Sequence, residues 1–285
     1  MNGAARLGVY SAALVALAAG MAAIGWAAGP LERGRAADPV DIHTPEPSDA
    51  AHGATSGAGA QADGLSVAKD SLVLVPQQRV VRSGTPTPIR FTVHAGGEAL
   101  RMFDVEHERE MHLIVVPRDL SGFQHLHPVR DPDGTWRAAI RLPRAGAYRA
   151  FADFATGGER TVLGWDLSAP GMFDVRPLPP PAAAARAGPF DVALADRDVA
   201  AGKESTLAFA VNRAGRVVAV DPYLGARGHL VILREGDLAY LHTHADEEEL
   251  RFDTTFPSAG RYRAFLQFSA EGKVHTAAFT IEVDG

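Results

Sequence analysis

The stretch that decides the fold occurs twice: residues 112–127 read HLIVVPRDLSGFQHLH, and residues 229–244 read HLVILREGDLAYLHTH. Each has a histidine, twelve residues, a histidine, one residue and a histidine. Further along, PRAGAYRAFADF at residues 143–154 matches PSAGRYRAFLQF at residues 257–268, with eight of twelve positions identical. Two matching blocks in the same order indicate a duplicated unit, so we predict two tandem repeats.

Both repeats have the pattern of short strands separated by turn residues, and no convincing helical period appears outside the N-terminal segment. The strands are expected at 89–94, 112–116, 123–128, 136–142 and 148–154, and then at 206–211, 229–233, 238–243, 250–256, 262–268 and 274–283. The Ala-Gly-x-Tyr turns that end at Tyr148 and Tyr262 resemble the tyrosine corner of immunoglobulin-like sandwiches. We therefore predict an all-β chain with two tandem immunoglobulin-like β-sandwiches.

The N-terminal segment is typical of a membrane anchor. Residues 7–29 carry no charge over 23 positions, which is about the length of helix that spans a bilayer. We favour an uncleaved signal-anchor over a cleaved signal peptide, because Gly25-Trp26-Ala27 is a poor cleavage site. The segment predicts a single span in the cell membrane with extracytoplasmic domains, or secretion if it is cleaved.

Composition divides the rest of the chain. The segment after the anchor is rich in Ala, Gly, Pro, Asp and Ser and buries too little apolar surface to fold, and PLPPPAAAARAGP favours an extended spacer. We predict a signal segment at 1–29, a disordered tether at 30–64, the first sandwich at 65–176, a Pro/Ala linker at 177–189 and the second sandwich at 190–285.

Several functions are disfavoured by composition. The net charge of −6 argues against a nucleic-acid partner. The chain has no cysteine, which excludes thiolate-ligated metals, so a metal site must use His, carboxylate or Met. No motif pairs a nucleophile with a base, and we expect no enzymatic activity and no catalytic residue.

The eleven histidines are the most informative residues. Side chains two apart on a strand share a face, so His125 and His127 converge, as do His242 and His244. In a hairpin whose loop has an even number of residues, His112 lies across from this pair on the neighbouring strand and on the same face. The same holds for His229 in the second repeat. We predict a three-histidine metal site in each repeat, with the nitrogens of the first trio within about 4 Å of one another. A one-residue bulge near Gly122 would break the trio.

The fourth position is open to water or a carboxylate. Asp104 and Asp221 each lie eight residues before the first histidine of a trio, and they serve equally well to cap a turn. All-imidazole sites suit Cu²⁺ and Zn²⁺, and the Irving–Williams order makes copper the first choice and zinc the second. Calcium and magnesium are disfavoured because they require oxygen ligands.

The chain resembles a set of exported bacterial proteins with tandem immunoglobulin-like domains, mostly uncharacterised and some of them described as heavy-metal-binding. The resemblance rests on MHLIVVPRDLSGFQHLHP, GHLVILREGDLAYLHTHA and YRAFLQF followed by KVHTAAFTIEV, and covers roughly residues 70–285. It implies exported immunoglobulin-like domains and no established activity. These proteins often have proline after the histidine pair, as at Pro128, whereas the second repeat has Ala245, which loosens the turn there.

The functional expectation is extracytoplasmic binding of a transition metal, for sequestration or for delivery to a protein partner. The alternative is a non-catalytic structural or protein-interaction module, in which the histidines are core or pH-sensitive residues. Convergence of the nitrogens of the first trio favours metal binding, and histidines on opposite faces of the sheet favour the alternative.

Overall fold

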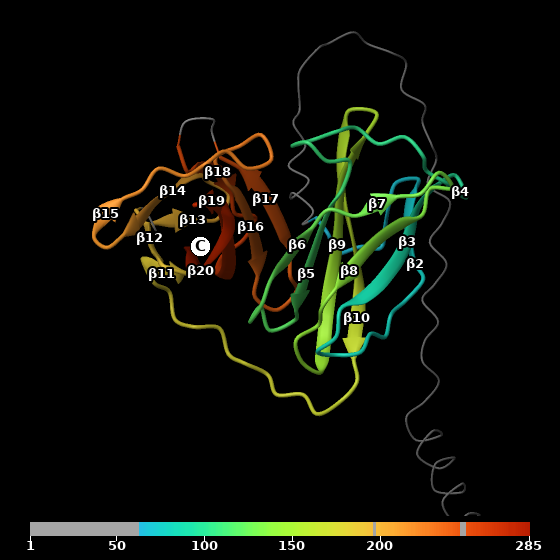
Figure 1. Cartoon of the computed structure of the whole chain (residues 1–285), viewed down its shortest axis with the longest axis horizontal. Helices are drawn as coiled ribbons and strands as arrows, with labels where there is room; N and C mark the ends of the chain where they lie inside the picture. The colour runs from blue at the N-terminus through green and yellow to red at the C-terminus, as the bar shows by residue number, and fades with distance from the viewer. Residues whose placement is uncertain (1–62, 196–197, 246–248) are drawn as a thin grey trace, which may run out of the picture. The chain divides into compact units, whose positions relative to one another are not determined.

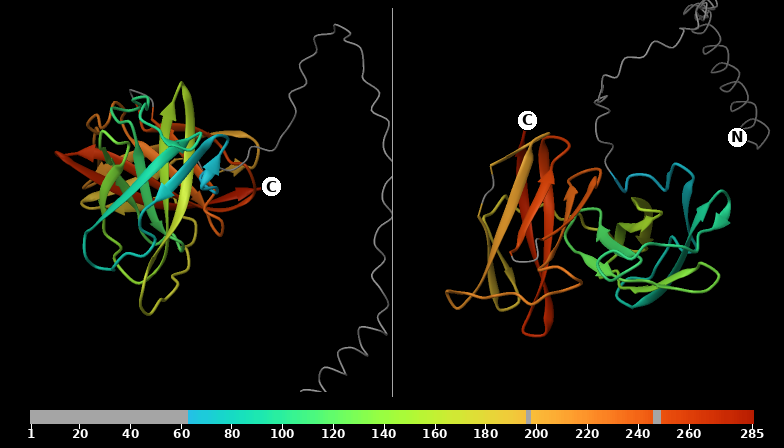
Figure 2. Two further views of the ribbon diagram at one scale, coloured as in Figure 1. Left: turned by 90° about the vertical axis from the view of Figure 1, so that its right-hand side faces the viewer. Right: turned by 90° about the horizontal axis from the view of Figure 1, so that it is seen from above.

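The computed structural model describes residues 63–195, 198–245 and 249–285, apart from the side chains of residues 242 and 244 (Figure 1). The predicted signal-anchor at 1–29, and all of the predicted tether except its last two residues, lie outside these ranges. Within them, no helix is long and apolar enough to cross a membrane. The described residues form strands, as predicted, and each repeat is a two-sheet sandwich (Figure 2).

The first repeat pairs a six-stranded with a four-stranded sheet. The larger sheet has the order β1-β2-β3-β8-β7, with β4 beside β3, and consists of β1 (Ala68–Lys69), β2 (Leu72–Pro76), β3 (Thr87–Ala95), β4 (Glu98–Ala99), β7 (Val129–Arg130) and β8 (Trp136–Ile140). The smaller has the order β10-β9-β5-β6 and consists of β5 (His112–Pro117), β6 (Gln124–Leu126), β9 (Gly146–Thr156) and β10 (Glu159–Ala169). The histidine hairpin therefore lies at one edge of the smaller sheet.

The second repeat has the same plan. One sheet has the order β11-β12-β14-β15, with β18 beside β14, and consists of β11 (Ala184–Ala187), β12 (Phe190–Leu194), β14 (Glu204–Arg213), β15 (Arg216–Val217) and β18 (Arg251–Thr255). The other has the order β13-β20-β19-β16-β17 and consists of β13 (Val199–Ala200), β16 (His229–Arg234), β17 (Tyr240–His244), β19 (Gly260–Ala270) and β20 (Lys273–Asp284). Here too the histidine hairpin, β16 and β17, lies at a sheet edge.

The structure contains strands that the sequence did not predict, among them β2, β10, β11 and β12. Strand β11 lies inside the range 177–189 that we assigned to a linker, because its backbone pairs with β12 and extends the sheet by one strand. Strand β10 was not among the predicted strands, although it pairs with β9 along its full eleven residues. It is buried over most of its length and its sequence lacks a clean alternation of apolar and polar residues, which hides it from a period-two search.

The strands that begin each histidine hairpin are buried on both faces. Leu113 and Val115 of β5 point into the core of the first sandwich, whereas Ile114 and Val116 belong to a separate apolar cluster that also contains Val231 of β16. This explains the nearly continuous apolar run HLIVV, since a strand covered on both sides has no polar face. His112 alternates with Leu113 and therefore lies on the outer face, with Ile114.

The outer cluster contains residues from both repeats. Its buried members are Ile114, Val116, Leu120, Phe151, Val162, Leu178, Val231, Leu233, Leu238, Tyr240 and Phe265. Phe123 stacks on Phe265 with ring centroids 4.6 Å apart, and Tyr240 stacks on Phe151 at 4.9 Å. Phe123 of the first repeat aligns with Tyr240 of the second, and Phe151 aligns with Phe265. Each stack therefore joins the same two aligned positions, with the two repeats interchanged. The repeats thus meet through a packed apolar contact.

The tyrosine corner predicted in each repeat is confirmed. The Tyr148 hydroxyl donates to the carbonyl of Arg144 at 2.8 Å, and the Tyr262 hydroxyl donates to the carbonyl of Ser258 at 2.8 Å. Both rings are buried. Each phenol therefore ties the start of a long strand, β9 or β19, to the turn that precedes it.

Replacing Tyr148 by phenylalanine is expected to lower the free energy of unfolding by about 1 kcal/mol, because the carbonyl of Arg144 loses a buried donor while the ring still fills its space. Urea denaturation of the purified chain measures this loss. Tyr262→Phe should produce a loss of similar size in the second repeat. An unchanged urea midpoint in both variants would contradict the corner's contribution to stability.

Candidate metal centre

The first trio is assembled by the hairpin of β5 and β6. The antiparallel register pairs Ile114 with His125 and Leu113 with Leu126, so the next position along pairs His112 with His127. Cross-strand partners lie on the same face of a sheet. The structure therefore brings His112, His125 and His127 together on the outer face, and no bulge at Gly122 separates them.

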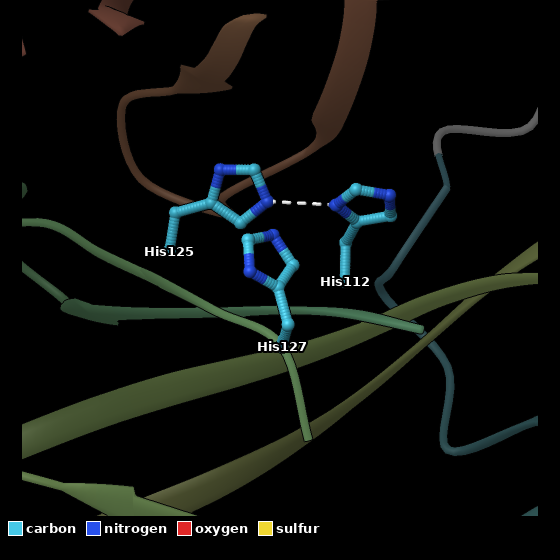
Figure 3. A group of neighbouring side chains, drawn as sticks. All are labelled: His112, His125 and His127. Carbon is cyan, nitrogen blue, oxygen red and sulfur yellow. Dashed lines mark hydrogen bonds between the residues drawn. The ribbon is translucent and has the colours of Figure 1, made fainter. Parts of the chain in front are cut away.

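The three rings form a compact group (Figure 3). One nitrogen from each lies within 4.8 Å of the others, somewhat wider than the 4 Å we expected. The ring centroids of His112 and His125 are 5.1 Å apart, those of His112 and His127 are 5.2 Å apart, and those of His125 and His127 are 4.9 Å apart. Imidazoles bound to one ion at roughly 2.0–2.1 Å with tetrahedral angles have centroids about 5.2 Å apart. The spacing of the rings thus fits one shared ion.

The outer nitrogens of two rings face acceptors. Nδ1 of His125 lies 2.6 Å from Oε1 of Gln267, and Nε2 of His112 lies 3.3 Å from the carbonyl oxygen of Glu106. Neither oxygen can donate, so in neutral rings these nitrogens carry the protons. The inner nitrogens, Nδ1 of His112 and Nε2 of His125, then direct lone pairs at each other across 2.8 Å. A cation between them, whether a proton or a metal ion, relieves that repulsion.

His127 contributes a neutral ring. Burial, with a smaller contribution from the positive charge of Arg109, lowers the pKa of His127 to about 4. Its Nε2 atom is buried and has no hydrogen-bond partner among the described residues. Figure 3 shows this ring reaching toward the gap between the other two. The lone pair of His127 is therefore free of a proton at neutral pH, as a metal ligand requires.

The second repeat reproduces the backbone of this arrangement. In the register of β16 and β17, His229 pairs with His244 and Val231 pairs with His242. Nε2 of His229 donates to the carbonyl of Tyr223, six residues earlier, at 2.9 Å. Glu106 likewise lies six residues before His112. The side chains of His242 and His244 are outside the described part of the chain, so the geometry of the second trio stays a prediction.

The candidate carboxylates are placed differently. Oδ2 of Asp104 accepts a hydrogen bond from the backbone N–H of Gly158 at 2.7 Å, which is the turn role that the sequence left open. The backbone of Asp221 pairs with Ser269 in an isolated bridge. Among the described residues, the group that could hold a metal contains three histidines and neither aspartate. The position of Asp104 thus does not support the expectation that it supplies a ligand, whereas Asp221 as a ligand of the second trio stays a prediction.

Sequence reasoning missed Gln267. This residue is the β19 partner of His229, and its amide oxygen holds His125 of the other repeat. The aligned residue of the first repeat, Asp153, is the β9 partner of His112. The signal available in the sequence was that Asp153 and Gln267 occupy the same aligned position, which pairs with the first histidine of each repeat.

Asp153 has different partners. It is buried and forms a bidentate ion pair with Arg160. Its Oδ2 atom also accepts a hydrogen bond from the hydroxyl of Tyr240 at 3.0 Å. Burial, followed by the negative charge of Asp153, raises the pKa of Tyr240 well above its usual range, which keeps that hydroxyl a donor. Asp153 and Gln267 therefore each reach across to the opposite repeat.

A comparison with known protein families agrees with a duplicated unit. A family model described as "Domain of unknown function (DUF8832)" matches residues 66–171 and again residues 184–285. The comparison with curated proteins gave no match.

Solved structures similar to the chain include three proteins of low identity. They are a two-domain fibronectin type III segment of chicken tenascin (10% identity, 73% of this chain and 99% of that chain, TM-score 0.24), the Escherichia coli adhesin FdeC (12%, 76% and 65%, TM-score 0.26) and E. coli alpha-2-macroglobulin (11%, 75% and 20%, TM-score 0.27). The chain thus spans a fifth of the macroglobulin structure.

Proposed function

Since the chain belongs to the DUF8832 family, whose description states no activity, we propose from the geometry of its imidazoles that it binds a transition-metal ion through His112, His125 and His127. The observation that carries the proposal is the convergence of three nitrogens within 4.8 Å, with the far sides of two rings held by oxygen acceptors. Such outer acceptors fix the tautomer and orientation of metal-binding histidines.

Copper is the first choice of ion and zinc the second. The trio offers imidazole nitrogens and no carboxylate, a donor set that suits Cu²⁺ and Zn²⁺ and disfavours Ca²⁺ and Mg²⁺. An ion with tetrahedral angles sets its ligand nitrogens about 3.3 Å apart. The facing nitrogens of His112 and His125, now 2.8 Å apart, separate by roughly half an ångström to admit it.

The task that suits this site is sequestration or delivery of the metal outside the cytoplasm. The uncharged segment at 7–29 supports export and attachment to the membrane, or secretion if it is cleaved. Nothing in the trio resembles a nucleophile with its base, which supports binding without catalysis. A protein partner would then receive or supply the ion.

One observation favours the alternative of a purely structural module. His112 and His229 are buried, and His125 is hydrogen bonded to Gln267 of the other repeat, so the same residues also serve as contacts between repeats. In that case the cation between His112 and His125 is only a proton. The experiment that tests the proposal separates the two functions.

The purified full-length chain, stripped with chelator, is equilibrated with Cu²⁺ or Zn²⁺ and desalted, and bound metal is counted by mass spectrometry. We expect bound ion in the wild type and its loss in a His125→Ala, His127→Ala double variant. The matched control is His94→Ala on β3, a half-buried histidine whose ring contacts Thr92 and Gly97. Equal metal content in the wild type and the double variant would refute the assignment.

A further inference from the structure

We infer that His229 of the second repeat is a fourth nitrogen ligand of the ion held by the first trio, so that the metal links the two repeats. This inference rests on the proposed function. The duplicated sequence predicts two separate sites, one in each repeat. The structure places the first histidine of the second repeat, His229, beside the first trio.

The placement of His229 follows from strand alternation. It begins β16, and the residues two and four further along, Val231 and Leu233, belong to the apolar cluster shared by the repeats. Its exposed fraction is 1%. Its ring centroid lies 5.9 Å from that of His125 and 6.2 Å from that of His112. A tetrahedral site requires about 5.2 Å, so an approach of roughly 1 Å brings His229 into the ligand sphere.

The protonation of His229 suits the role. Its Nε2 donates to the carbonyl of Tyr223, so the neutral ring carries its proton there and has its lone pair on Nδ1. His112 is arranged in the same way, with Nε2 toward the carbonyl of Glu106 and Nδ1 toward His125. The two first histidines of the repeats therefore present the same atom as a ligand.

The second repeat is also tied to the trio at this point. Gln267, the register partner of His229 on β19, holds His125 at 2.6 Å. The carboxylates nearby are engaged elsewhere, because Asp153 pairs with Arg160 and Tyr240, and Asp104 accepts from Gly158. An imidazole from the second repeat is thus the ligand that the geometry offers for the fourth position.

The test counts nitrogen ligands. The full-length chain receives one equivalent of Cu²⁺, electron paramagnetic resonance and X-ray absorption report the coordinated nitrogens, and competition with a chelator gives the affinity. We expect four nitrogens in the wild type and three in His229→Ala, with an affinity lower by roughly tenfold or more, since loss of groups that only support a ligand already costs about 10- to 100-fold. His229→Gln, which keeps an N–H for the carbonyl of Tyr223, should behave alike and guards against misfolding.

Two controls make the outcome specific. The ring of His107 lies 5.7 Å from that of His229, and His107→Ala should keep four nitrogens, as should the distant His94→Ala. Three outcomes overturn the inference and leave metal binding intact: an unchanged nitrogen count in both His229 variants, loss of a nitrogen only in His107→Ala, or only three nitrogens per ion in the wild type. A wild type that binds no Cu²⁺ overturns the proposed function itself.

Discussion

Replacing Phe151 by alanine is expected to lower the free energy of unfolding by about 3–5 kcal/mol, the range for removing a fully buried phenylalanine from a packed core. Phe151 has no exposed surface and stacks on Tyr240 of the other repeat. Its loss leaves a cavity in the cluster that joins the repeats. Urea denaturation, followed through the fluorescence of the buried Trp136 and Trp165, measures the change.

Phe173 provides the matched control for this prediction. It is 45% exposed and its ring lies beside the guanidinium of Arg144, so Phe173→Ala should cost less than about 1 kcal/mol. Phe123→Ala tests the equivalent stack, because Phe123 is half-buried against Phe265. A Phe151 variant as stable as the Phe173 variant would mean that the two repeats do not share a packed contact in solution.

The sandwich fold was predictable because local signals agree with the tertiary structure. The duplicated blocks at 112–127 and 229–244 set the number of repeats, and alternation placed His125 and His127 on one face of their strand. The tyrosine corners at Tyr148 and Tyr262 mark where β9 and β19 begin. Each of these signals lies within a short stretch of chain and needs no knowledge of how the repeats meet.

The contact between the repeats was not predictable in this way. The alternation of side chains along a strand indicates which residues share a face, but it does not indicate what packs against that face. The apolar residues Ile114 and Val116 were the sign in the sequence that this outer face is covered, and core histidines were the alternative to metal binding. His112 is indeed buried, and it also lies within the group that could hold a metal.

The partners of the site were missed for a related reason. Comparing aligned positions looks for the same role in both repeats, and the aligned residues Asp153 and Gln267 differ in type and in charge. In the structure each acts on the opposite repeat: Gln267 holds His125, 142 positions away in the chain, and Asp153 accepts from Tyr240. Their roles depend on docking of the two sheets, which no local pattern encodes.

Replacing Gln267 by leucine is expected to weaken metal binding by about 10- to 100-fold, the effect of removing a group that orients a metal-binding histidine. Leucine has a similar volume, but it cannot accept a hydrogen bond from the N–H at Nδ1 of His125. That ring therefore loses both its fixed tautomer and its orientation. Titration of the full-length chain with Cu²⁺ against a competing chelator measures the affinity.

Gln267→Glu separates orientation from simple disruption of packing. Glutamate keeps an acceptor at the same place, and its negative charge makes the ring of His125 more basic, so this variant should bind metal at least as tightly as the wild type. Both variants alter the same buried position on β19, and a general loosening of the packing there would weaken metal binding in both. Equal weakening would therefore assign Gln267 a packing role only, whereas loss in the leucine variant alone shows that a hydrogen bond from one repeat prepares a ligand on the other.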